Sequence, residues 1–110
     1  PMYEVIEKQR ILPDGTEIST YTRDVISANI LEVEAGTTGY MGGDSGHGRR
    51  TYFRISDCGS TDMEVRTIVD RHGCNGFEVF LGGDCELKTT IRALKFITKV
   101  LEDESKEVCD

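Results

Sequence analysis

The chain has 110 residues, enough for one domain that buries a single hydrophobic core. Hydrophobic residues make up 37% and charged residues 30%, which excludes a generally disordered chain, and the formal net charge of −7 opposes broad binding to DNA or RNA. Because no apolar run approaches the roughly 20 residues of a membrane span and no signal-peptide pattern is present, we expect a cytoplasmic protein without membrane contact.

Residues 1–27 are predicted to form an N-terminal hairpin. Two segments of strand-like composition flank the sequence Pro13-Asp14-Gly15. The Asp-Gly pair favours a hairpin turn because it tolerates the positive φ angles that such turns require.

Residues 28–82 are predicted to continue the sheet. Apolar and polar residues alternate with period 2 in four further segments, 28–35, 50–56, 63–70 and 77–81, which is typical of strands. A glycine-rich loop is expected over 36–48. A second turn is expected in the sequence HGCNG, where Asn75-Gly76 is the strongest turn signal.

Residues 84–104 are predicted to form the one helix, followed by an acidic tail over 105–110. Leu87, Ile91, Leu94 and Leu101 recur at helical spacing and make an apolar stripe. Asp84 follows two glycines and is a suitable N-cap, because its carboxylate can accept from the first free backbone amides. The expected fold class is therefore α+β: a mostly antiparallel sheet of about five to six strands, with the C-terminal helix packed on one face.

The outward face of this sheet is unusually apolar. Ile30, Tyr52, Ile68 and Phe80 occupy positions where an antiparallel sheet ordinarily shows polar residues. One such residue on each of several strands indicates a covered face. A second subunit is the simplest cover, so we expect a homo-oligomer; a ligand platform is the alternative.

The cysteines and histidines indicate no metal site. The four cysteines form no Cys-x-x-Cys pair, and we expect free thiols: Cys58, Cys74, Cys85 and Cys109. His72 and Cys74 lack the usual zinc spacing toward Cys58 or His47. We therefore expect neither a metal nor a cofactor.

The glycine-rich segment contains the quartet Gly43-Asp44-Ser45-Gly46, which resembles the sequence around the nucleophile of trypsin-like serine proteases. Those enzymes are far longer and place the histidine and aspartate upstream of the serine. Here no histidine precedes Ser45, and His47 is too close in sequence to act as a free base. We interpret the quartet as coincidental.

The same segment is better suited to holding an anion. Closely spaced glycines let backbone amides converge on one point, and the arginines that follow add planar donors suited to phosphate. An aromatic residue beside them could stack on a base or a sugar. The structural alternative is a glycine-rich loop whose polar residues satisfy only local backbone groups. The predicted ligand-binding residues are Gly42, Gly43, Asp44, Ser45, His47, Arg49, Arg50, Tyr52 and Arg54.

From NILEVEAGTTGYMGGDSGHGRRTYFRI through GFEVFLGGDCELKTTIRALKFITKVL, the chain resembles small uncharacterised proteins of bacteria and their phages. That resemblance implies no particular activity. By size, acidity and expected oligomeric state the chain is also similar to phage anti-defence proteins that sequester nucleotide immune signals. This second resemblance implies binding of a nucleotide-derived ligand without turnover.

We therefore expect a non-enzymatic domain that binds a small anionic, nucleotide-derived ligand. One alternative is a protein-interaction or inhibitor module that uses the outer sheet face. Another is a small hydrolase or transferase that uses His47 and Asp44.

Overall fold

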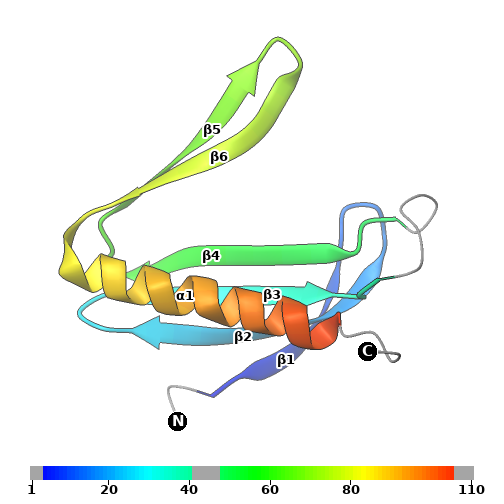
Figure 1. Ribbon diagram of the computed structural model, residues 1–110, viewed down its shortest axis with the longest axis horizontal. Helices are drawn as coiled ribbons and strands as arrows, with labels where there is room; N and C mark the ends of the chain where they lie inside the picture. The colour runs from blue at the N-terminus through cyan, green and yellow to red at the C-terminus, as the bar shows by residue number, and fades with distance from the viewer. Residues whose placement is uncertain (1–3, 41–47, 106–110) are drawn as a thin grey trace.

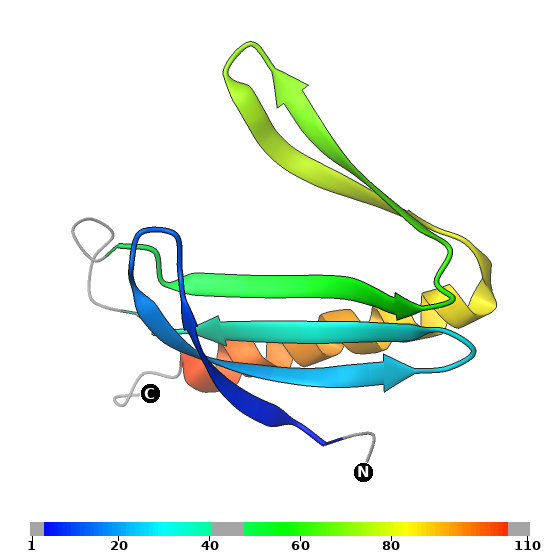
Figure 2. The same cartoon turned by 180° about the vertical axis from the view of Figure 1, so that it is seen from behind.

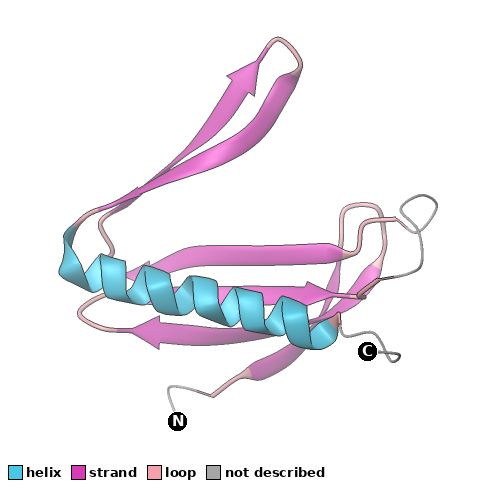
Figure 3. Cartoon of the chain, viewed as in Figure 1, coloured by secondary structure: helices cyan, strands magenta, loops and turns pink. Residues whose placement is uncertain are grey.

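The computed structural model describes residues 4–40 and 48–105. Six antiparallel strands form two separate sheets, and one helix follows them, so the predicted α+β class with a C-terminal helix is confirmed (Figures 1 and 3). The strands are β1 (Ile6–Ile11), β2 (Glu17–Ile26), β3 (Ile30–Thr37), β4 (Thr51–Gly59), β5 (Met63–Asp70) and β6 (Gly73–Leu81); the helix is α1 (Gly83–Glu104). Within the described residues, no helix is long and apolar enough to cross a membrane.

The larger sheet is a meander in the order β1-β2-β3-β4. Its first hairpin turns at the predicted place. Gly15 has φ +90°, and the Asp14 carboxylate accepts a hydrogen bond from the Thr16 amide at 3.1 Å. Side-chain capping of the turn and a left-handed glycine thus fix the register of β1 on β2.

Helix α1 lies along one face of this sheet (Figure 1). The strands contribute Leu31 and Val33 to the core, and the helix contributes Ala93 and Ile97, all of them buried. Small and branched side chains at helical spacing let α1 lie close to β3, the strand that it contacts most.

The β1–β2 hairpin folds over the opposite face of the sheet, where Figure 2 shows β1 crossing in front of the other strands. Gly36 on β3 permits this close crossing. A Cβ at that position would lie 2.2 Å from the Ser19 carbonyl oxygen and 2.9 Å from the Thr20 Cα. The hairpin therefore buries polar residues that a flat sheet would leave in water.

Strands β5 and β6 form a two-stranded arm that projects from the end of the larger sheet (Figure 1). The expectation of one continuous sheet was wrong in this respect. Ile68 and Phe80 lie on the arm, whereas Ile30 and Tyr52 belong to the larger sheet. These residues do not share one outward face.

The arm also turns four residues earlier than the predicted Asn75-Gly76 turn. Its turn is Arg71-His72, where the Asp70 carboxylate accepts from the His72 amide at 2.7 Å and Gly73 has φ +113°. Asn75-Gly76, the predicted turn, lies inside β6 beside a register shift between Ile68 and Val69. The aspartate before the turn therefore decides its position.

Hydrogen bonds between residues far apart in the sequence tie the base of the arm to the body. The Gly82 amide donates to the Asp62 carbonyl at 3.1 Å, and the Asp62 amide donates to the Glu86 carboxylate at 3.1 Å. The buried Asn29 side chain donates to the hydroxyls of Thr61 and Thr89 at 3.1 and 3.0 Å. The β2–β3 turn, the arm and the start of α1 thus meet in one polar junction.

The start of α1 differs from the prediction. The N-cap is Gly82, so no side chain caps the helix there. Asp84, the predicted N-cap, lies within the first turn together with Glu86. The helix begins one residue earlier than predicted, at Gly83, whose φ of +85° is a left-handed value that glycine tolerates best. Both carboxylates still favour the positive end of the helix dipole.

Candidate functional site

The structure separates the predicted binding residues into two groups. Gly42, Gly43, Asp44, Ser45 and His47 lie outside the described residues. The remaining predicted residues lie at the start of β4 or just before it: Arg49, Arg50, Tyr52 and Arg54. Of these, Arg50 lines a pocket on the helix side of the larger sheet, whereas Tyr52 and Arg54 belong to the opposite face.

The Arg50 pocket lies between the start of β4, the end of β3 and the C-terminal end of α1. Its volume is about 190 Å³, and it is lined by Thr37, Gly39, Tyr40, Arg50, Thr51, Leu101 and Ser105. The Arg50 carbonyl accepts from the Thr38 amide at 3.0 Å, which fixes the backbone beneath the side chain. One guanidinium nitrogen of Arg50, Nη1, is buried and has no hydrogen-bond partner among the residues that the structure describes.

Two threonine hydroxyls make the polar floor of the Arg50 pocket. Thr37 Oγ1 and Thr51 Oγ1 lie 3.0 Å apart in a cross-strand pair, and Thr37 Oγ1 also accepts from the Gly39 amide at 3.1 Å. Gly39 has φ +84°, and a Cβ there would lie 3.0 Å from the Glu104 carbonyl oxygen. The chain after β3 therefore rests directly on the helix end, which closes the pocket on that side.

The charges around the Arg50 pocket are mixed. The carbonyl end of α1 carries partial negative charge, and the last helical turn has no basic residue. Its carbonyl oxygens suit hydrogen-bond donors such as hydroxyl or amino groups. The pocket thus combines one cationic donor with neighbouring acceptors.

The opposite face holds a polar network around Glu34. This carboxylate is 0% exposed and accepts two hydrogen bonds from Arg10 at 2.8 Å, one from Thr20 at 2.6 Å and one from Arg54 at 3.0 Å. Burial by itself would raise the pKa of Glu34, but the hydrogen bonds from Arg10, Thr20 and Arg54 outweigh it and hold the pKa at about 2. Glu34 is therefore ionised at neutral pH.

Arg54 and Tyr52 both contact other residues of this network. Arg54 also donates a hydrogen bond to Glu32 at 2.6 Å, and this bond is the main reason that the pKa of Arg54 is raised. The Arg10 guanidinium lies 4.8 Å from the centroid of the Tyr52 ring. These side chains stabilise the folded hairpin over the sheet and lie on the other face from Arg50.

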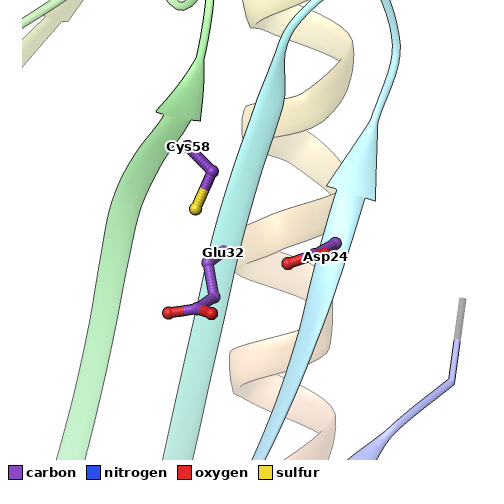
Figure 4. A group of neighbouring side chains, drawn as sticks. All are labelled: Asp24, Glu32 and Cys58. Atoms are coloured by element: carbon purple, nitrogen blue, oxygen red, sulfur yellow. The ribbon is translucent and has the colours of Figure 1, made fainter. Parts of the chain in front are cut away.

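A second group on this face combines two carboxylates with a thiol: Asp24 on β2, Glu32 on β3 and Cys58 on β4 (Figure 4). Their ligand atoms lie within 4.8 Å of one another. Desolvation raises the pKa of the Cys58 thiol, and the charges of Glu32 and Asp24 raise it further. A protonated thiol and a carboxylate already paired with Arg54 are poor metal ligands, so the cluster does not define a metal site.

An apolar cleft lies between the arm and the body. Its volume is about 490 Å³, and all but one threonine of the described residues that line it are apolar: Leu31, Phe53, Ile55, Met63, Val65, Phe77, Val79, Leu81, Thr90 and Leu94. Across the cleft the rings of Phe53 and Phe77 approach to 6.3 Å between centroids. Period-2 alternation gives each of β5 and β6 an apolar face, but it gave no sign that Val65, Phe77 and Val79 line a cleft.

Comparison with protein-family models, with curated proteins and with solved structures finds no match to this chain. The function is therefore inferred from the geometry of the site. Sequence reasoning placed Arg50 in that site but missed Thr51, Leu101 and Ser105. No local pattern marks them, because the end of α1 meets β3 and β4 only through the tertiary fold.

Proposed function

We propose that the protein binds a small anionic ligand of nucleotide type without converting it, and that Arg50 contacts the anion. The observation that supports this most directly is Arg50, which lines the pocket and whose buried Nη1 has no hydrogen-bond partner among the described residues. A buried guanidinium donor without an acceptor is costly, and a phosphate oxygen supplies the acceptor in a geometry that arginine favours.

The other groups of the pocket favour a phosphate ester over a free phosphate. The hydroxyls of Thr37 and Thr51 can bond phosphate or sugar oxygens, and Tyr40, with 73% of its surface exposed, offers a ring at the rim on which a base can stack. The carbonyl end of α1 disfavours a highly charged ligand but accepts from sugar hydroxyls. A nucleoside monophosphate or cyclic nucleotide fits these demands better than a triphosphate.

Binding without turnover is supported by the chemistry of the described lining residues. They include no histidine, cysteine or carboxylate, which are the side chains that most often transfer protons. Sequestration of a nucleotide signal inside a cell, the role implied by the resemblance to anti-defence proteins, would require only recognition. His47 and Asp44, the residues of the enzymatic alternative, lie outside the described residues.

Isothermal titration calorimetry tests the proposal. The panel contains AMP, GMP, cyclic mononucleotides and dinucleotides, ATP and inorganic phosphate. We expect at least one monophosphate ester or cyclic nucleotide to bind more tightly than ATP and inorganic phosphate. Because a hydrogen bond to a charged group is worth about 1.5–3 kcal/mol, Arg50→Ala should weaken that binding about 10- to 100-fold.

The matched control is Arg71→Ala, which removes the same charge at the turn of the arm and should leave affinity unchanged. Arg49→Ala removes an exposed neighbour of Arg50 and should have a smaller effect than Arg50→Ala. Absence of binding across the panel, or equal losses in the Arg50 and Arg71 variants, would contradict the proposed function.

A further inference from the structure

The arm buries few of its own apolar side chains. An isolated two-stranded hairpin is marginal in water and needs packing on at least one face. Within the described residues, β5 and β6 pair only with each other, and their apolar side chains stay accessible. Val65 is 55% exposed and Phe77 57%, and Leu94 on the facing side of α1 is 51% exposed.

The dimensions of the molecule agree with an uncovered surface. A folded monomer of 12.3 kDa is expected to expose about 6,100 Å², whereas this chain exposes 7552 Å². Its radius of gyration is 15.6 Å, against about 13 Å for a compact domain of this length. The excess area exceeds the roughly 800 Å² that each partner buries in a standard protein interface.

We propose that the apolar cleft and the arm form the interface of a homodimer, in which the arm of each copy packs against the cleft of the other. A single copy carries both halves of this contact. The arm offers apolar side chains that include Val65 and Phe77, and the body offers an apolar surface that includes Phe53 and Leu94. A two-fold arrangement brings each strip onto the partner's groove, so one surface serves both copies.

The charge distribution favours a second copy over a charged partner. None of the described residues that line the cleft is charged, as in the centre of a stable interface. Each copy has a net charge of −7, so long-range repulsion opposes association while the cleft itself adds none. A dimer of this chain should therefore become tighter as salt screens the repulsion, whereas a complex with a basic partner would weaken.

Light scattering after size exclusion provides the first test. The wild-type chain should have twice its mass of 12.3 kDa, and the dimer dissociation constant should fall as sodium chloride rises from 20 to 500 mM. Phe77→Asp and Val65→Asp each place a charge in the cleft and should give monomers at concentrations where wild type is dimeric. Ile11→Asp is the matched control, because Ile11 is 68% exposed on β1, outside the cleft, and should stay dimeric.

Amide hydrogen exchange on the wild-type protein tests the same interface without a substitution, in case an aspartate variant unfolds. Arm amides should be protected in the wild type at high concentration and lose protection on dilution, before those of β2 and β3. A wild type that stays monomeric up to several hundred micromolar would overturn the proposal, including a monomer that carries a bound apolar small molecule in the cleft. An oligomer unaffected by both cleft substitutions in folded protein would overturn it as well.

Discussion

Replacing Glu34 by glutamine tests whether the buried network holds the β1–β2 hairpin over the sheet. The substitution keeps the shape of the side chain but removes its charge. Arg10 then loses its carboxylate partner, while Arg54 keeps only Glu32. Glu34 is fully buried and the Arg10 side chain is 37% exposed, so the unpaired guanidinium is only partly solvated while the hairpin keeps its place.

The magnitude follows from the pKa of Glu34. Its value of about 2, against an ordinary 4.5, corresponds to about 3 kcal/mol of stability. Because the folded-state pKa is lowered, this stability is present above pH 4.5 and is lost as the pH falls toward 2. Glu34→Gln should therefore lower the free energy of unfolding by about 3 kcal/mol at pH 7, in line with the loss of one member of a buried ion pair.

Urea unfolding followed by circular dichroism measures this effect at fixed protein concentration between pH 7 and pH 2. The wild-type stability should approach that of the glutamine variant at the acid end of the series. Glu32→Gln is the matched control: its carboxylate pairs with Arg54 on the same face but is partly exposed, so it should cost less than about 1 kcal/mol. Parallel pH profiles for wild type and Glu34→Gln would refute the reasoning.

Two further substitutions test the close contacts of the body. Gly36→Ala should destabilise the fold by about 1–3 kcal/mol in the same urea assay, because its Cβ would overlap the Ser19 carbonyl oxygen. Gly59→Ala is the control and should be nearly neutral, because its Cβ would lie 3.9 Å from the nearest atom. Asn29→Ala should cost about 1–2 kcal/mol by thermal unfolding, because it cuts two hydrogen bonds at the base of the arm. Gln9→Ala, which removes an exposed hydrogen bond, should shift the melting temperature much less; equal shifts would contradict this account.

The elements of this fold were predictable because their signals are local. Period-2 alternation marked the strands, and the apolar stripe with Leu87 and Leu101 marked the helix. The first hairpin followed from Asp14-Gly15. The second turn was misplaced because Asp70, which caps the true turn, is a weaker sequence signal than Asn75-Gly76.

The grouping of those elements was not predictable from the same signals. Alternation shows that a segment has two faces but not which strand it pairs with, so the arm was read as part of one sheet. Glu34 stood at an outward position of a strand, and nothing local showed that Arg10 would be folded over it at Gly36. Arg50 was predicted as a binding residue from its composition and neighbours, whereas the residues at the helix end that share its pocket follow only from the tertiary fold.

The polar junction at the base of the arm has a consequence for recognition. Glu86 and Gly82 both hold Asp62, and Asn29 holds the neighbouring threonine, so the direction in which the arm leaves the body is set when the chain folds. A partner then meets a hairpin whose direction these hydrogen bonds restrain. Less conformational entropy is lost on docking, and a modest apolar contact can hold a complex that a freely swinging hairpin could not.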